Sequence, residues 1–360
     1  MALPATTLQA VATTGGADEK PSTAKVGSYF ALWYALNIGY NVYNKKALNV
    51  VALPWTIASL QLYLGIPYVR RPLSCWCRCA RATTHHPQPP LTTHPPPPPL
   101  RYVLLMWASG LRKAPKLTND NVKNLMPVSL CHLFTHIGAV VSLGAGAVSF
   151  THIVKASEPV VSAGLSAAFL GQVFHPVVYL TLVPIIGGVG LASLKELSFT
   201  WLAFGAAMVS NVASASRGIV GKGLMGKPQG ENMTPTNLYA VLTMISAVLI
   251  TPLALVAESP AKIASTVSAA ISSGAVTGPT LALHVVLSGL FYYMYNEVAF
   301  LALDSVNPVT HAVGNTIKRV VIILASVVVF RNPISPLGQV GSAIAIFGTL
   351  LYSLAKGKFA

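Results

Sequence analysis

Long apolar segments separated by short polar or charged connections run through most of the chain. A helix needs about 20 predominantly apolar residues to cross a bilayer. The pattern predicts an all-α membrane protein with ten transmembrane helices, and the even number places both termini on the same side. The longest connection, about 258–280, is rich in Ser and Ala and is expected to be a flexible loop. The ten segments are residues 26–47, 54–69 (continued further along the chain), 122–143, 146–170, 177–194, 200–221, 237–257, 281–302, 308–330 and 336–355.

The composition agrees with this prediction. Of the 360 residues, 53% are hydrophobic and 9% are charged, whereas soluble domains carry about 25% charged residues. The 24 basic residues outnumber the 9 acidic ones, for a formal charge of +15. Most basic residues fall in connections and at segment ends, which is typical of membrane topology and of contact with anionic headgroups. We therefore expect membrane lipid as a partner and no nucleic acid.

The second apolar segment is interrupted by a low-complexity, Pro-rich stretch at residues 70–103. Removing this stretch joins SLQLYLGIPYV to LLMWASGL in one apolar helix of suitable length. We predict an in-frame insertion, partly polyproline-like and otherwise disordered; a genuine loop that binds a partner is the alternative. The first 25 residues are rich in Ala, Thr and Ser and resemble the end of an organellar transit peptide. A disordered segment 1–25 is thus expected before a membrane domain at 26–360.

Basic residues inside the apolar segments are the strongest indication of chemistry. A cation at mid-depth costs about 2.5–3.5 kcal/mol even on lenient insertion scales, so it indicates a binding site unless it extends to the headgroups. Lys318 and Arg319 are adjacent in the middle of segment 308–330, which carries no carboxylate. Lys155 and Arg217 lie in two other segments. If all four face one cavity, the Arg forks and Lys point charges form a site for a compact dianion such as phosphate.

Residues near these cations are expected to support them. Glu158 follows Lys155 by one helical turn and is expected to moderate its charge. His132 and His152 are expected to be structural, as hydrogen-bonding partners between helices. Small residues such as Gly138 let neighbouring helices approach closely.

Other polar residues are candidates for contact with the organic part of a ligand. In the sequence FYYMYNEVAF, Tyr295 with Asn296 and Glu297 is expected to lie deep and to line a cavity. Tyr292 and Tyr293 fit an aromatic belt at the membrane interface. The candidates are His136, Tyr295 and His311.

A short internal repeat suggests that the chain has two related halves. Thr-His-Ile-Val at 151–154 recurs as Thr-His-Ala-Val at 310–313, a shift of 159 residues. Each copy opens an apolar segment and is followed by a cation within two turns, Lys155 or Lys318. Repeats of this kind are typical of secondary transporters, which bind substrate where the repeats meet.

Four stretches carry a resemblance to a known family. They are CHLFTHIGAVVSLGAGAVSFTHIVKASEPV, SLKELSF, YNEVAFLALDSVNPVTHAVGNTIKRVVII and SAIAIFGTLLYS. Together they resemble the plastidic phosphate translocators of the drug/metabolite transporter superfamily. The resemblance implies ten helices in two inverted five-helix repeats. It also implies alternating-access exchange of inorganic phosphate for a phosphorylated C3, C5 or C6 compound across the inner plastid envelope.

The resemblance also implies roles for individual residues. His136 and Tyr295 fall at positions that contact the rest of the substrate. His311 matches the triose-phosphate and phosphoenolpyruvate groups, which favours a C3 substrate. Ala139 and Val140 depart from the usual Thr or Ser followed by Asn, which removes a hydroxyl contact. The residues implied to bind phosphate are Lys155, Lys318 and Arg319, with Arg217 also at the site.

Two alternatives to this interpretation remain open. One is a nucleotide-sugar or other sugar-phosphate transporter of the Golgi or endoplasmic reticulum, which would need a roomier pocket. The other is a scaffold or receptor that uses the Pro-rich stretch to bind partners. An enzyme is not expected, because no nucleophile–base pair or metal-ligand set is present. No cofactor or metal is expected, since the Cys75-x-Cys77-x-Cys79 spacing is not that of a zinc knuckle. The oligomeric state is open, with a homodimer as one option.

Overall fold

The computed structural model describes residues 23–65, 107, 110, 112–194, 196, 198–224, 230–306, 308–331 and 334–359. Within these residues the chain forms helices and no β-strand, apart from one isolated bridge between Lys116 and Glu231. The predicted insertion 70–103 lies outside the described residues, as does most of segment 1–25. The helices are α1 (Thr23–Val50), α2 (Pro54–Leu64), α4 (Asn119–Ala145), α5 (Val148–Lys155), α6 (Glu158–Leu170), α7 (Pro176–Leu180), α8 (Leu182–Leu194), α9 (Trp201–Leu224), α10 (Pro235–Ala257), α11 (Pro260–Ser272), α12 (Gly278–Ser305), α13 (Pro308–Phe330) and α14 (Pro336–Phe359).

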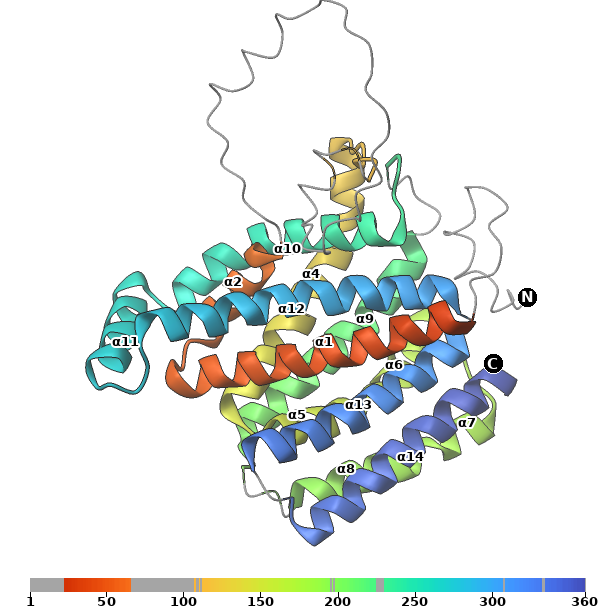
Figure 1. The fold of residues 1–360 in the computed structure, drawn as a ribbon. Helices are drawn as coiled ribbons and strands as arrows, with labels where there is room; N and C mark the ends of the chain where they lie inside the picture. Colours follow the sequence, from red (N-terminus) through yellow and green to blue (C-terminus); the bar gives the residue numbers. More distant parts are fainter. Residues whose placement is uncertain are drawn as a thin grey trace, which may run out of the picture.

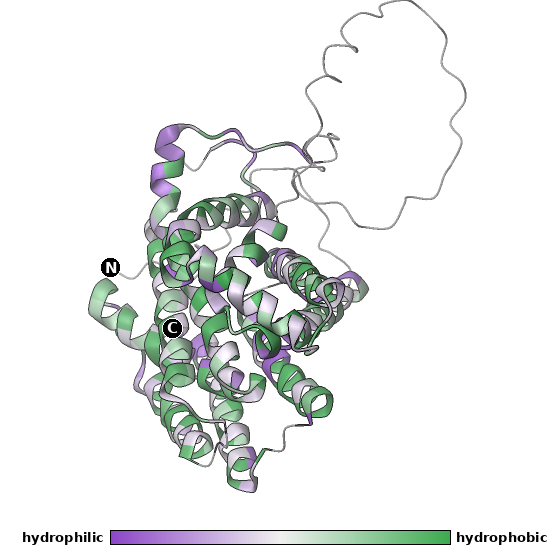
Figure 2. Ribbon diagram, turned by 90° about the vertical axis from the view of Figure 1, so that its left-hand side faces the viewer, coloured by the Kyte–Doolittle hydropathy of each residue, from purple (hydrophilic) through white to green (hydrophobic). Residues whose placement is uncertain are grey.

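The helices are suited to a membrane by both length and composition. Among the described residues, seven helical stretches are long and apolar enough to cross a bilayer. Green, hydrophobic residues predominate along the helices in Figure 2. The prediction of an all-α membrane protein is confirmed, whereas the number of ten spans stays a prediction. The seven stretches are α4, α5 with α6, α7 with α8, α10, α12, α13 and α14.

Side-chain caps and prolines fix several helix starts. The hydroxyl of Thr234 accepts a hydrogen bond from the Asn237 backbone N–H, and Pro235 occupies the first turn of α10. Ser259 and Pro260 start α11 in the same way. The prediction of a flexible loop over 258–280 is therefore wrong, because α11 occupies more than half of it. Apolar side chains of α11, such as Ile263, pack against the main hydrophobic core.

Three pairs of long helices form the framework of the bundle. Helix α1 lies beside α12, α4 beside α9, and α8 beside α14 (Figure 1). At the second pair, a Cβ atom on Gly138 would lie 2.8 Å from the Ala206 carbonyl oxygen of α9. At the third, a Cβ atom on Gly188 would overlap the Ala345 backbone nitrogen. Only glycine permits these approaches, so the expectation for Gly138 is confirmed.

Two buried charged residues fix one end of the bundle. The ammonium of Lys45 on α1 is buried and donates to the carbonyl oxygens of Leu143 and Gly146, each at 2.8 Å. These carbonyls belong to the C-terminal end of α4, where a cation is favourable. The carboxylate of Glu258 accepts from backbone N–H groups at the start of α2, including that of Thr56 at 2.8 Å. The ends of α1, α2, α4 and α10 are therefore tied together.

Candidate functional site

A cavity of about 300 Å³ lies inside the bundle, lined by α1, α4, α5, α6, α9, α12 and α13. It contains all the residues that the sequence predicts for a binding site. Four are cations and three are the candidates for the organic part of a ligand. They are Lys155, Arg217, Lys318, Arg319, His136, Tyr295 and His311. The structure thus brings the whole predicted set together, from five different helices.

A break between α5 and α6 positions Lys155 at the cavity. The sequence predicts one continuous helix over 146–170, but α5 ends at Lys155 and α6 begins at Glu158. The cause is Pro159, which has no N–H to donate to the Lys155 carbonyl and whose ring would clash with it. Helix α6 therefore directs its N-terminal end, with its positive partial charge, toward the same region as the Lys155 side chain.

Each of the four cations has a partner on another helix. Nζ of Lys155 donates to Oγ of Ser210 at 2.6 Å, and an Arg217 guanidinium nitrogen lies 3.0 Å from Nδ1 of His132. Because a guanidinium only donates, this ring nitrogen must be unprotonated and accept. The remaining pairs join α13 to α1 and to α6. They are Lys318 with the Trp33 ring, 4.6 Å from Nζ to the centroid, and Arg319 with Glu158, 2.9 Å from Nη2 to Oε2.

The direct partner of Glu158 lies far away along the chain. Its carboxylate forms an ion pair with Arg319, 161 residues away, and accepts a second hydrogen bond from Oγ of Ser214 at 2.5 Å. Lys155 donates its hydrogen bond to Ser210, while the charge of Glu158 acts on Lys155 through space, as expected. Segment 308–330 indeed carries no carboxylate, but a carboxylate from α6 reaches it.

Aromatic rings cover part of the cavity wall. Tyr292 is 3% exposed and lines the cavity, with its ring centroid 4.0 Å from that of His136. Tyr40 of α1 contacts Tyr295 at 5.3 Å between centroids. The prediction that Tyr292 and Tyr293 form an interfacial belt is wrong, because both are buried.

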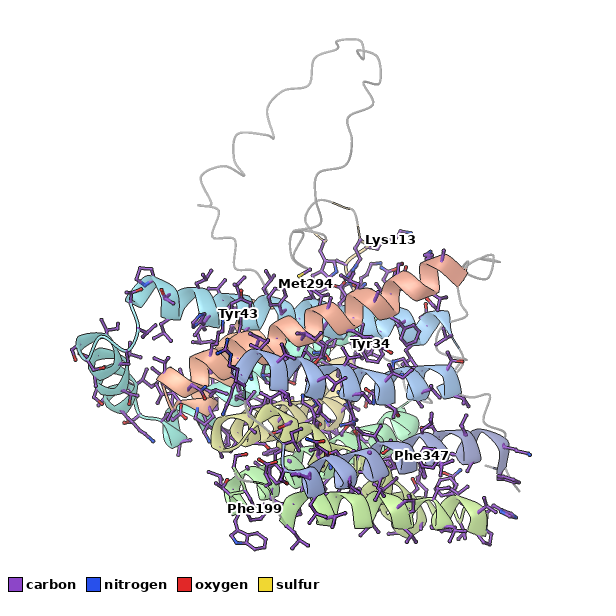
Figure 3. The ribbon with its side chains drawn as sticks, turned by 60° about the horizontal axis from the view of Figure 1, so that its bottom comes forward. Tyr34, Tyr43, Lys113, Phe199, Met294 and Phe347 are labelled. Atoms are coloured by element: carbon purple, nitrogen blue, oxygen red, sulfur yellow. The ribbon has the colours of Figure 1, made fainter. Side chains whose placement is uncertain are left out.

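Residues of α12 and α13 that were expected to line the cavity do so, with one exception. Asn296 lines the cavity as expected, but Glu297 does not and instead pairs with Arg112 at 2.5 Å. His311 stacks on Trp33, with 5.0 Å between ring centroids. The adjoining turn of α13 is held by a hydrogen bond from the Tyr34 hydroxyl of α1 to the Gly314 carbonyl at 2.8 Å. Figure 3 shows Tyr34 between α1 and α13.

Sequence reasoning missed several polar residues of the cavity wall. Asn37 and Asn41 are buried on α1, and Nε2 of His152 lies 3.0 Å from Oδ1 of Asn41. His132 and His152 both line the cavity, although their hydrogen bonds to other helices are those of the structural residues we expected. Two asparagines four residues apart in an apolar segment were the available signal.

Within the described residues, no group of three His, Cys, Asp or Glu side chains could hold a metal ion. The expectation of no metal and no cofactor stays a prediction.

Comparison with known proteins shows that most of this chain matches one protein family. The family model described as the Triose-phosphate Transporter family matches residues 24–85 and 100–353. The unmatched residues 86–99 fall inside the predicted insertion. The chain is 38% identical over 339 residues to glucose-6-phosphate/phosphate translocator 1, chloroplastic, of Arabidopsis thaliana, which covers 94% of this chain and 77% of that protein.

Relatives named for other substrates are nearly as similar. Phosphoenolpyruvate/phosphate translocator 1, chloroplastic, of Oryza sativa subsp. japonica is 36% identical over 344 residues, with 95% of this chain and 75% of that protein covered. The triose phosphate/phosphate translocator, chloroplastic, of Spinacia oleracea is 35% identical over 347 residues, with 96% and 76% covered. Overall identity therefore does not select among their organic substrates.

Proposed function

This chain belongs to the Triose-phosphate Transporter family, and from that premise we propose that it exchanges inorganic phosphate for a phosphorylated C3 compound. The compound is a triose phosphate, 3-phosphoglycerate or phosphoenolpyruvate. The exchange takes place across the inner plastid envelope, by alternating access. The chloroplast translocators among the relatives support the compartment and the phosphate.

The observation that carries this proposal is the charge of the cavity. Four cations line it, while Glu158 is the single carboxylate among the described lining residues. Lys155, Lys318 and Arg319, with Arg217, are assigned to the phosphate group. Guanidinium forks and ammonium groups in a site of low dielectric are the donors that a phosphate dianion prefers.

The size of the cavity and His311 support a small organic group. Ligand pockets span about 300–1,000 Å³, and this cavity of about 300 Å³ lies at the lower end. A nucleotide sugar would need more space. His136, Tyr295 and His311 are assigned to the organic part, and His311 is the residue that the resemblance associates with C3 substrates.

The helix pairs support two inverted repeats. If α9 corresponds to α1 and α12 to α4, the pair α1–α12 maps onto the pair α9–α4. If α14 likewise corresponds to α8, the pair α8–α14 maps onto itself. The repeated Thr-His-x-Val sequences then fall near the start of corresponding helices, α5 and α13. A two-fold arrangement around the cavity suits alternating access, in which the two halves rock around a fixed site.

Charge also accounts for exchange rather than one-way transport. Closing an empty cavity would remove clustered cations from water, which costs several kcal/mol per ion. A bound dianion offsets most of that charge and lets the cavity close. Only loaded transporters should therefore change orientation.

Reconstitution tests the proposal. Purified protein is placed in liposomes preloaded with dihydroxyacetone phosphate, 3-phosphoglycerate, phosphoenolpyruvate, glucose 6-phosphate or buffer alone, and uptake of labelled phosphate is measured. Fast uptake against C3 preloads and slow uptake against buffer is the expected result. Equal uptake into buffer-loaded liposomes would contradict exchange, and preference for glucose 6-phosphate would contradict the C3 assignment. An external nucleotide sugar should not compete.

A further inference from the structure

Glu158 is an unusual residue in a site built for anions. It lines the cavity, and its two carboxylate oxygens have two different partners. Oε2 accepts from Nη2 of Arg319 at 2.9 Å, and Oε1 accepts from Oγ of Ser214 at 2.5 Å. The Arg319 side chain is 7% exposed and that of Glu158 is 26% exposed, so the pair is mostly, but not wholly, shielded from water. A buried ion pair of this kind is costly to break from one side only.

The local structure around Glu158 is favourable for a negative charge. Glu158 is the first residue of α6, directly after the break that Pro159 causes. The positive end of a helix dipole stabilises a carboxylate in the first turn. An arginine fork, a hydroxyl donor and a helix N-terminus are together the features of a phosphate site. Here a carboxylate of the chain itself occupies them.

We propose that Glu158 is a resident anion of the cavity, which competes with the substrate for Arg319 and sets how much negative charge the site accepts. This inference rests on the proposed function. With Glu158, the four cations leave a formal charge of +3, so a bound phosphate dianion leaves +1. Without it, the corresponding values are +4 and +2. Binding should tighten, while closure of the loaded cavity should become harder.

The substitution Glu158→Gln separates these two effects, because Gln keeps the size and removes the charge. Its single oxygen can accept from Arg319, and its amide NH2 can donate to Oγ of Ser214. We expect the half-saturation concentration for phosphate to fall about tenfold, since a unit charge within several ångströms has effects of that order or larger at an effective dielectric of about 20. The maximum exchange rate should fall as well. A role in folding alone would lower the rate without tightening binding.

A pair of substrates of the same size gives the sharper readout. Dihydroxyacetone phosphate and 3-phosphoglycerate both have three carbons, but the second carries an additional carboxylate. Loss of one negative charge favours the more highly charged ligand more, so Glu158→Gln should raise the preference for 3-phosphoglycerate over dihydroxyacetone phosphate by about tenfold. Glu158→Asp keeps the charge and should retain the wild-type preference.

The matched control is Glu231→Gln. Glu231 lies outside the bundle core and pairs with Lys116 at 2.8 Å, and its side chain is 70% exposed. The hydrogen bond from Lys116 lowers the pKa of the Glu231 carboxyl, so this substitution also removes a real charge at neutral pH. Because the lost charge is screened by water, both kinetic values should stay at the wild-type level.

Three results decide the matter. If liposomes that contain the wild-type protein exchange no phosphate, the proposed function is refuted, and this inference with it. Wild-type exchange together with an unchanged or weaker affinity and an unchanged substrate preference in Glu158→Gln would refute the inference alone. If Glu158→Gln transports too slowly to measure, the protection of purified protein by phosphate against thermal unfolding reports binding directly. Protection at lower phosphate concentration than in the wild type supports the resident anion, and the reverse overturns it.

Discussion

The aromatic face of Trp33 is expected to hold Lys318 in its binding position. Trp33 is 2% exposed, and Nζ of Lys318 lies 4.6 Å from its ring centroid. A desolvated cation–π pair is worth about 2 kcal/mol, and each 1.4 kcal/mol is about tenfold in affinity. Trp33→Leu removes the π face but keeps an apolar side chain. It should therefore raise the half-saturation concentration for phosphate about 30-fold.

Two further variants separate the cation–π contact from loss of packing. Trp33→Phe keeps a smaller π face and should fall between the wild type and Trp33→Leu. Trp201→Leu is the matched control, because Trp201 is 79% exposed at the start of α9 and does not line the cavity. Its half-saturation concentration should equal that of the wild type.

The assay is phosphate/phosphate exchange in liposomes, with rates normalised to the amount of inserted protein. Phosphate is used on both sides because His311, which is assigned to the organic part of the substrate, stacks on the same Trp33 ring. Phosphate has no organic part, so its half-saturation concentration reports the contact between Trp33 and Lys318. The reasoning is refuted if Trp33→Leu stays within about twofold of the wild type, since a contact of that small effect would not position Lys318.

Three further predictions concern the framework of the site. Lys318→Ala or Arg319→Ala should abolish phosphate uptake while the protein still inserts; retained uptake would make the pair structural. His132→Phe removes the acceptor of the α9 guanidinium, and because a hydrogen bond to a charged group is worth about 1.5–3 kcal/mol, phosphate affinity should fall by about tenfold or more. His132→Gln should restore part of it, and equal loss in both variants would contradict a role as acceptor. Gly138→Val would place a side chain against the α9 backbone and should lower the free energy of unfolding by about 1–3 kcal/mol, measured in detergent. An unchanged melting temperature would show that α4 and α9 can separate without cost.

The residues of the site were predictable because a charged residue inside an apolar segment can be recognised from the sequence alone. A cation inside an apolar segment is costly wherever the segment lies, so Lys155, Arg217, Lys318 and Arg319 could be selected before any packing was known. The structure places all four in one cavity. Their roles toward phosphate stay predictions.

The partners of these cations were not predictable in the same way. Arg319 and Glu158 are 161 residues apart, and Arg217 and His132 are 85 apart. Such pairs depend on which helices are neighbours and how they are rotated, and periodicity of a single segment fixes neither. Glu158 was therefore assigned to Lys155, its neighbour along the chain, by the helical spacing that governs isolated helices.

Two errors about helix boundaries had signals in the sequence. Pro159 follows Lys155 by four residues, which is the spacing at which a proline removes a helical hydrogen bond. Ser259 followed by Pro260 is the start signal of a helix, yet the Ser- and Ala-rich composition of the following residues suggested a loop. In both cases a proline in the first turn of the new helix was the local signal.

The kinds of partner at the cavity explain how three of the cations are held in place without ion pairs. Lys155, Arg217 and Lys318 are held by a hydroxyl, an imidazole and an indole face, which are all neutral. If a carboxylate held each of them, the empty cavity would be nearly uncharged, and a dianion would have to break buried ion pairs, at several kcal/mol each, in order to bind. Neutral partners fix the same geometry and leave the charge to the substrate. If closure depends on a bound dianion, as we propose, strict exchange follows from the chemistry of these three contacts, and Glu158 sets how strongly closure depends on the dianion.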